Sequence, residues 1–244
     1  MSGRPALVAW LIAAALVAGA TSSGAQRGGA AAPPRTAQES APIDLTGYWV
    51  SFITEDWRFR MMTPPKGDYT RVPLTPEGRK VADGWNPAAD QAAGLECKAY
   101  GAGAIMRVPG RFHITWQDAG TLGIESDAGM QTRTLRFAAS APPGERTWQG
   151  SSTARWDIAT QSLSVVTTNM RAGYLRRNGV PYSENATVTE HFDVAPYPDG
   201  GQVLIVTTIV EDPQYLQRTF IVSSHFKKER DGSRWSPAPC SATW

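Results

Sequence analysis

The sequence predicts a single, predominantly β domain built from antiparallel strands. Short runs rich in β-branched and aromatic residues alternate with turns that contain Gly, Pro, Asn or Asp, a spacing typical of β-barrels and β-sandwiches. Hydrophobic residues make up 41% of the chain, which is enough for one core. The stretch 43–244 has a length that suits one such domain.

The strand pattern recurs about ten times along the chain. A meander of this length usually closes on itself, because closure removes the unpaired edges of the sheet. We therefore expect an antiparallel barrel. The expected strands are residues 47–53, 104–108, 112–118, 121–126, 131–137, 148–158, 163–170, 186–194, 203–212 and 220–228.

Residues 55–100 interrupt this pattern and contain five prolines. Thr75-Pro76-Glu77 combines an N-cap residue, a proline for the first helical turn and an early acid, so a short helix is expected up to about Asp83. A connection this long within one domain is usually functional, and we interpret it as a lid over one barrel mouth. A second insert, residues 171–185, carries the turn signal Asn178-Gly179 and is expected to form another rim of that mouth.

The first expected strand opens with Asp44-Leu-Thr-Gly47-Tyr48-Trp49. Its Gly-x-Trp resembles the first-strand motif of the lipocalins and related calycins. The resemblance implies a barrel of eight strands, closed at the bottom by Trp49, with a cavity for a small, mostly apolar ligand. The segments Thr54–Arg60 and Thr63–Tyr69 also resemble stretches of uncharacterised exported bacterial proteins, which implies no activity.

The chain departs from the lipocalin pattern in its greater length, in its higher strand count and in the insert that directly follows the first strand. The resulting prediction is an all-β, antiparallel lipocalin-like barrel of about ten strands. It carries a long lid-like insert that contains a short helix. Such a fold does not by itself fix a function.

The N-terminal residues predict export to the periplasm or secretion. Arg4 precedes the apolar run Ala6–Ala20, and Ser23-Gly24-Ala25 provides small residues before a cleavage point. This order is typical of a secretory signal peptide. The alternative, a membrane anchor, is disfavoured because a span needs about 20 apolar residues. We assign residues 1–25 to the signal peptide, 26–42 to a flexible leader and 43–244 to the barrel, with no membrane span in the mature chain.

The charge balance indicates which partners to expect. The formal net charge is +2, and Arg4 leaves with the signal peptide. A nearly neutral chain offers no electrostatic argument for binding nucleic acid. We expect a small hydrophobic or aromatic ligand, consistent with a chain that has 9 Trp residues and could line a cavity with flat aromatic faces. The oligomeric state is not predicted.

The chain has two cysteines, Cys97 and Cys240. In an exported protein they most simply form one disulfide, which would tie the C-terminal tail to an early loop. The alternatives are two free thiols or a thiol nucleophile at Cys97, but neither cysteine lies in a recognisable nucleophile motif.

The three histidines, His113, His191 and His225, all fall in expected strands. Since strand residues alternate between faces, these histidines lie either on the solvent side or in a polar lumen. In the second case His113 is the candidate general acid or base, with His191 as a further candidate, and Trp116 of the same strand is a candidate ligand contact. No short His-x-His spacing is present, so neither a metal nor another cofactor is predicted.

Two polar clusters fall in the inserts. Glu55, Asp56, Trp57 and Arg58 lie where the first strand ends. Either carboxylate could exchange protons if desolvation raises its pKa, and Trp57 and Arg58 are candidate ligand contacts. The alternative is a charged turn.

The second insert offers Arg171 and Tyr174 as ligand contacts, and a guanidinium there could fix a carboxylate or phenolate. Arg176 and Arg177 belong to the same insert. The favoured alternative for this group is a solvated basic loop.

These observations lead to two main functional hypotheses. In the first, the barrel binds a small hydrophobic or aromatic molecule in its cavity. In the second, it is a cofactor-independent lyase, isomerase or cyclase in which His113 moves protons with help from Glu55 or Asp56. A third possibility, a non-catalytic partner in an envelope complex, would require an exposed apolar patch.

Overall fold

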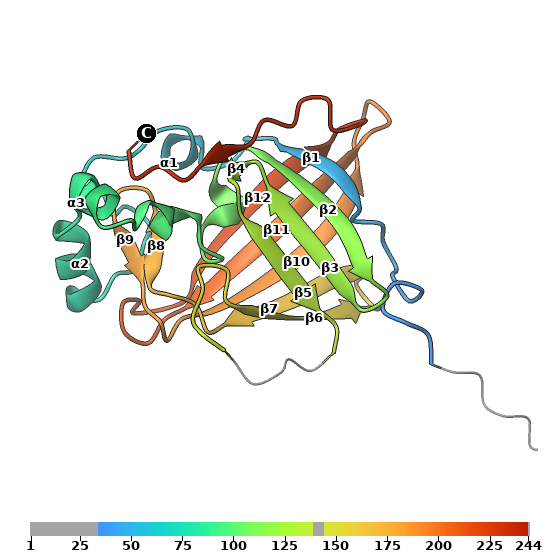
Figure 1. Ribbon diagram of the computed structural model, residues 1–244, viewed down its shortest axis with the longest axis horizontal. Coiled ribbons are helices and arrows are strands. Elements are labelled where there is room, and N and C mark those ends of the chain that lie inside the picture. The colour runs from blue at the N-terminus through green and yellow to red at the C-terminus, as the bar shows by residue number, and fades with distance from the viewer. Residues whose placement is uncertain (1–33, 139–143, 244) are drawn as a thin grey trace, which may run out of the picture. The chain divides into compact units, whose positions relative to one another are not determined.

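Nine strands close into a barrel, so the predicted barrel is confirmed in its coarse form (Figure 1). The computed structural model describes residues 34–138 and 144–243, so the predicted signal peptide and the leader up to residue 33 lie outside it. The order around the barrel is β1, β12, β11, β10, β7, β6, β5, β3 and β2. The bounds are β1 Gly47–Ser51, β2 Arg111–Asp118, β3 Thr121–Ser126, β5 Thr132–Arg136, β6 Ser151–Asp157, β7 Ser162–Thr168, β10 Thr187–Pro196, β11 Gln202–Glu211 and β12 Phe220–Lys228.

One pair of neighbouring strands departs from the antiparallel prediction. β5 and β6 run parallel, with Leu135 opposite Ser152. After β5 the chain returns to the opposite end of the barrel, where Thr147 bridges Met170, before β6 begins. A parallel pair requires such a crossover. The strict antiparallel prediction was wrong because residue periodicity marks a strand without giving its direction.

The strand expected at residues 104–108 is also absent. In its place lies the short 3-10 helix η2 (Ile105–Arg107), in which Ile105 and Met106 are almost fully buried. A run this short and apolar does not distinguish a strand from a buried helical turn. The barrel therefore has nine strands, of mixed direction.

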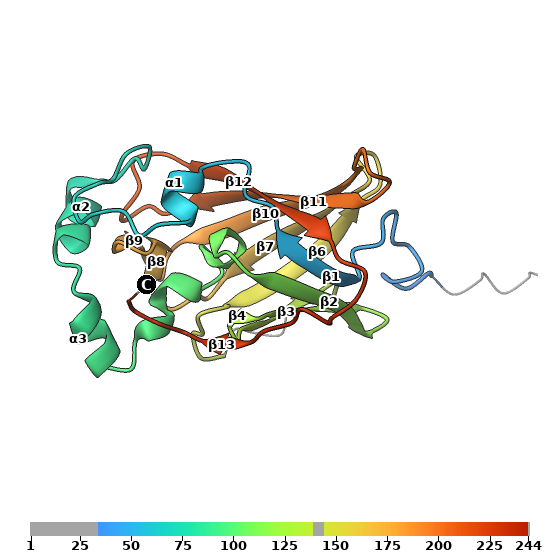
Figure 2. The ribbon, with the colours of Figure 1, turned by 90° about the horizontal axis from the view of Figure 1, so that it is seen from above.

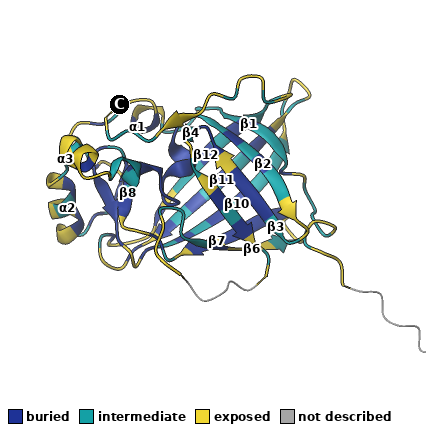
Figure 3. Ribbon diagram, in the orientation of Figure 1, coloured by how far each residue is buried: buried dark blue, intermediate teal, exposed yellow. Residues whose placement is uncertain are grey.

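Buried and partly exposed residues alternate along the barrel strands (Figure 3). On β2, Phe112 and Ile114 are buried, while His113 lies on the outer face. Aliphatic and aromatic side chains fill most of the interior, as in other small barrels, and a buried ion pair of Arg133 and Glu190 lies among them. The largest of them include Trp49, Phe112, Phe192 and Phe226.

Trp49 is completely buried and anchored by polar contacts. Its indole Nε1 donates to the carbonyl of Leu45 at 2.8 Å. The ammonium group of Lys228 lies 4.4 Å from the centre of the indole ring, within the range of a cation–π contact. These contacts fix the start of β1 against the end of β12.

A cap covers one end of the barrel, while the segment that begins at residue 35 lies at the other end (Figure 2). The elements of the cap are α1 Trp57–Arg60, α2 Pro76–Asp83, α3 Pro87–Ala92, η1 Glu96–Tyr100, β8 Gly173–Arg176 and β9 Val180–Tyr182. The cap and the nearby strand ends share a second apolar cluster that includes Tyr69, Leu74, Tyr182 and Phe220.

The predicted helix start at Thr75 is confirmed. The hydroxyl of Thr75 accepts a hydrogen bond from the amide of Gly78 at 3.0 Å, and Pro76 occupies the first helical turn. The turn at Asn178-Gly179 is present as well and joins β8 to β9, with Gly179 at φ +82°. Both inserts thus fold into the cap.

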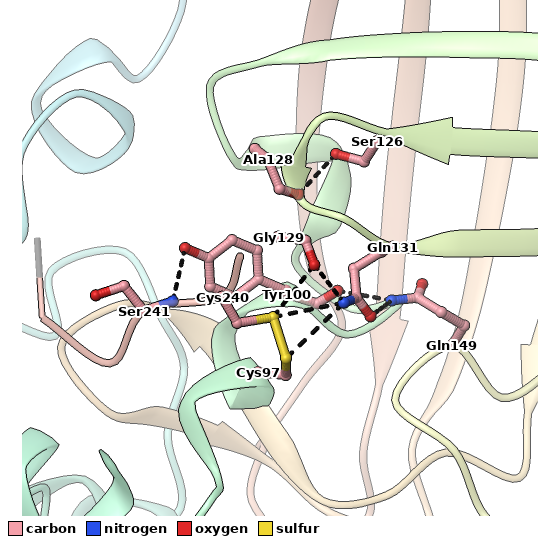
Figure 4. Close-up of a disulfide and its surroundings, with 9 residues drawn as sticks. All are labelled: Cys97, Tyr100, Ser126, Ala128, Gly129, Gln131, Gln149, Cys240 and Ser241. Atoms are coloured by element: carbon pink, nitrogen blue, oxygen red, sulfur yellow. Dashed lines mark hydrogen bonds between the residues drawn. A yellow bond between two sulfur atoms is a disulfide. The ribbon is translucent and has the colours of Figure 1, made fainter. Parts of the chain in front are cut away.

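The two cysteines are joined in a disulfide, Cys97–Cys240 (Figure 4). Cys97 belongs to η1, and Cys240 follows β13 (Ala238–Pro239), which pairs with β4 (Ala128–Gly129). The disulfide therefore ties the C-terminal tail to the cap, as the sequence predicted.

The last part of the expected leader is ordered against the barrel. The indole Nε1 of Trp156 donates to the carbonyl of Ala37 at 2.7 Å, and the amide of Gln38 donates to Ala119 at 3.1 Å. Residues 36–40 form a hydrogen-bonded turn around Thr36. These contacts place residues 37 and 38 of the expected leader against the barrel. Among the described residues, no helix is long and apolar enough to cross a membrane.

Candidate functional site

The candidate site forms where the barrel wall loses a strand. β1 pairs with β12 only from Trp49 opposite Lys228 to Ser51 opposite Phe226, with one further bond from the amide of Phe52 to the carbonyl of His225. The chain then turns away, through Asp56 in the left-handed conformation at φ 51°. The first half of β12 consequently pairs with β11 on one side and, among residues 34–138 and 144–243, has no strand on the other.

The space beside this half-paired strand is an open cleft of about 250 Å³, which we call the seam cleft. Its apolar wall is the start of β12, where Ile221 is 60% exposed. Its opposite wall is charged and comes from residues 55–71, from η2 and from β8. The lining residues are Glu55, Asp56, Arg71, Arg107, Arg176, Phe220, Ile221, Val222 and Ser223.

Two of the lining arginines are almost fully buried. Arg107 donates from Nη2 to Oδ2 of Asp56 at 2.6 Å. Arg176 donates from Nη1 to the carbonyl of Thr70 at 2.7 Å, and its guanidinium lies 4.0 Å from the ring centre of Phe59. These contacts hold both guanidinium groups at the inner wall of the cleft.

Two further arginines lie behind this wall. The buried Arg60 forms an ion pair with Glu55 and donates from Nε to the carbonyl of Arg107 at 3.0 Å. Arg177 donates from Nη2 to the carbonyl of Arg60. We refer to Arg60, Arg107, Arg176 and Arg177 as the arginine cluster.

Burial lowers the pKa of three arginines of this cluster, Arg60, Arg176 and Arg177. Burial, together with the positive charge of Arg107, lowers the pKa of Arg176 to about 10. Burial likewise lowers the pKa of Arg177 to about 10 and also lowers the pKa of Arg60. The cause is the same in each case, because a charged group loses hydration in a low-dielectric environment.

The first polar cluster singled out in the sequence lies at the cleft. Glu55 and Asp56 line it directly. Trp57 and Arg58 are exposed and border an adjoining groove that also contains Asp56 and Arg71. Arg58 donates to Asp68 at 2.7 Å. The structure thus brings together four of the nine residues proposed as catalytic or ligand-binding.

The histidines lie on the outer faces of their strands. His113 stacks on Tyr48, with ring centres 4.1 Å apart, and its Nδ1 lies 3.2 Å from Glu125. His191 alternates with the buried Glu190 and Phe192, so it also faces outward. Of the two alternatives, the structure supports the outer face, and a proton-transfer role in a lumen loses its geometric basis. Only His225 adjoins the cleft, with Nδ1 3.2 Å from Glu55.

The other predicted ligand contacts are scattered. Trp116 packs with Phe137 and Trp156 near the barrel end away from the cap. Arg171 is exposed and lies over the ring of Trp148 at 4.2 Å.

Tyr174 belongs to a separate cluster in the cap. Its hydroxyl donates to Asp90 at 2.6 Å, and Lys98 also donates to Asp90 at 2.6 Å. Burial, together with this hydrogen bond to Asp90, raises the pKa of Tyr174. Within the described part of the chain, no group of three or more His, Cys, Asp or Glu residues is arranged to hold a metal ion.

Sequence reasoning missed Arg107 as a site residue and treated Arg176 as part of a solvated loop. Arg107 lies in the segment predicted as a strand and adopts the η2 turn instead. Arg176 is only 3% exposed, which corrects the solvated interpretation. Its burial depends on Phe59 and Phe220, both distant in sequence, and no local signal reveals that contact.

Comparisons with known protein families, with curated proteins and with solved structures found no match.

Proposed function

We propose that this chain is an exported protein that binds a small molecule with an apolar or aromatic body in the seam cleft. The main supporting observation is that Phe220, Ile221 and Val222, at the half-paired start of β12, line an open cleft. Isolated apolar residues on a surface are common, but an apolar face within a concave, partly polar site is typical of ligand binding. The signal-peptide pattern of residues 1–25 supports export.

The proposed binding position differs from the central cavity implied by the lipocalin resemblance. The barrel interior is occupied by Trp49, Phe112, Phe192 and Phe226. The seam cleft, at about 250 Å³, is slightly smaller than typical ligand pockets, which measure about 300–1,000 Å³. A bicyclic aromatic molecule matches this size better than a long lipid does.

Binding of the neutral probe N-phenyl-1-naphthylamine tests this function, because its fluorescence rises in an apolar environment. We expect saturable binding that weakens at least tenfold in Ile221→Asp, which places a charge on the apolar wall. Ile221 is 60% exposed, so the fold should tolerate the change. Ile158→Asp is the matched control, since Ile158 is 63% exposed and lies outside the cleft. Equal binding by both variants, or none by the wild type, contradicts the proposal.

A chain of side chains beside the cleft favours a second candidate, hydrolysis of an ester. Ser223 Oγ lies 3.2 Å from His225 Nε2, and His225 Nδ1 lies 3.2 Å from Glu55 Oε2. This is the order of nucleophile, base and orienting carboxylate in serine hydrolases. In this role Ser223 Oγ attacks the ester carbonyl carbon, and His225 takes the hydroxyl proton and passes it to the leaving alcohol. Water then releases the acyl group.

Hydrolysis of 1-naphthyl acetate tests this candidate and also the earlier proposal for His113. If Ser223 is the nucleophile, Ser223→Ala and His225→Gln abolish turnover, while His113→Gln leaves it unchanged. Loss of turnover in His113→Gln alone would instead make His113 the general acid or base of this hydrolysis. Absence of turnover in the wild type leaves binding as the function.

A further inference from the structure

The surroundings of the seam cleft carry an excess of positive charge. Six arginines and three carboxylates lie in or beside it, a net charge of three positive units. The carboxylates are Glu55, Asp56 and Asp68, and the arginines are Arg58, Arg60, Arg71, Arg107, Arg176 and Arg177. Positively charged side chains are therefore concentrated around the seam cleft of a chain that is nearly neutral as a whole.

This excess positive charge destabilises the fold, because the four arginines of the arginine cluster are largely shielded from water. Buried charges are normally paired, since each loses several kcal/mol of hydration. Here Arg60 pairs with Glu55 and Arg107 pairs with Asp56. Arg176 donates to a neutral backbone carbonyl and stacks on aromatic rings instead. The charge of Arg176 is thus left without a carboxylate in direct contact among the described residues.

Three nitrogens of the arginine cluster also lack a hydrogen-bond acceptor among the described residues. They are Arg60 Nη2, Arg107 Nη1 and Arg176 Nε, and all three are shielded from solvent. Buried N–H groups without an acceptor are rare in folded proteins. An oxyanion would supply both the missing acceptors and the missing negative charge, and guanidinium groups match its geometry well.

The geometry places two of these groups, those of Arg107 and Arg176, next to space that a ligand can fill. Arg107 and Arg176 line the seam cleft and also a small inner cavity of about 10 Å³, bordered by Phe59 and Leu175. A cavity of that size holds about one water-sized group, such as one oxygen of an oxyanion. Phe220 and Val222 form the adjacent apolar wall.

We propose that the natural ligand of the seam cleft is an organic anion. Its carboxylate, sulfonate or phosphate group lies between Arg107 and Arg176, and its apolar body packs against Phe220 and Val222. This inference rests on the proposed binding function and adds the chemical class of the ligand.

Two fluorescent probes that differ only in charge provide the test. N-phenyl-1-naphthylamine is neutral, and 8-anilinonaphthalene-1-sulfonate carries a sulfonate on the same arylamine framework. The wild type should bind the sulfonate at least tenfold more tightly, since hydrogen bonds to charged groups are stronger than those between neutral groups. Arg107→Gln and Arg176→Gln should each weaken binding of the sulfonate about tenfold or more and change binding of the neutral probe less than threefold.

Arg136→Gln is the matched control, because Arg136 is exposed on β5 outside the cleft, and it should alter neither affinity. A Tm measured for each variant separates loss of the fold from loss of binding. If a Gln variant does not fold, competition by sodium sulfate on the wild type replaces it. Sulfate should then displace the anionic probe and leave the neutral probe bound.

The outcomes separate the two proposals. If both probes bind equally tightly, and the Gln variants and sulfate affect them equally, the anion inference is overturned and the binding function stands. If neither probe binds, the binding function fails, and the inference fails with it.

Discussion

The buried ion pair inside the barrel allows a quantitative prediction about stability. Arg133 on β5 and Glu190 on β10 face each other in the interior, with side-chain exposures of 1% and 0%. Two hydrogen bonds join them, at 3.1 and 2.6 Å, and Arg133 also contacts Thr167 at 3.4 Å. Glu190→Leu leaves the guanidinium buried without its partner.

The expected loss of stability depends on whether one partner of the pair is removed or both are replaced. Removing one partner of a buried pair destabilises a protein by about 3–5 kcal/mol, whereas replacing both by apolar residues is often neutral or stabilising. Glu190→Leu and Arg133→Met should therefore each lower the free energy of unfolding by about 3–5 kcal/mol. The double variant should recover most of this loss, because no charge is left unpaired.

Urea unfolding followed by tryptophan fluorescence measures these differences. With an m-value of about 2 kcal/mol/M, a loss of about 3–5 kcal/mol lowers the midpoint by roughly 1.5–2.5 M. The m-value itself should stay constant, since the exposed surface on unfolding is unchanged. Single variants within about 1 kcal/mol of the wild type, or a double variant as unstable as the singles, would refute this reasoning.

Three further changes have defined outcomes. Cys97→Ser opens the disulfide and should lower the free energy of unfolding by about 2–5 kcal/mol, which urea unfolding under non-reducing conditions checks. Burial and a hydrogen bond to Asp83 raise the pKa of Tyr69 to about 12, above its unfolded value of about 10. This stabilisation is complete below pH 10 and lost as the pH rises to 12, so Tyr69→Phe should flatten the measured pH dependence of Tm in that window. Gly179→Ala should lower the free energy of unfolding by about 2 kcal/mol or more, because Gly179 has a φ of +82° and the new Cβ would lie 2.3 Å from Trp85. An unchanged Tm would contradict this.

The strand pattern carried most of the fold information. The alternation of Phe112, His113 and Ile114 identified a strand with two different faces. It left open which face is inside, because that depends on how the whole sheet closes. The structure places the apolar face inward, so the histidines that seemed candidates for a polar lumen lie outside.

The candidate site was predicted only in part. The residues that were predicted are marked by a local sequence signal, whereas those that were missed owe their burial to segments far away in the sequence. Glu55 and Asp56 were found because a break in strand pattern beside charged residues is a local signal. Arg107 and Arg176 were missed because their burial comes from contacts between segments far apart in the chain, such as Arg107 with Asp56. Composition gives the charge of such residues but not their pairing.

The crossover between β5 and β6 also depends on contacts that the local sequence does not reveal. Turn residues between two strands resemble a hairpin connection, and the direction of the second strand is decided by pairing with β7. No local periodicity contains that information. The cysteines were an exception, because a chain with only two of them allows one intramolecular pairing.

Backbone NMR during titration with N-phenyl-1-naphthylamine tests the central claim most directly, since it reports where a ligand binds. The account predicts that the largest amide shifts fall in Phe220–Ser223 and at Asp56 and Arg107, the residues that line the seam cleft. Shifts centred instead on interior residues such as Phe192, or on Trp116 at the far end, would contradict it and would move the binding site away from the arginine cluster.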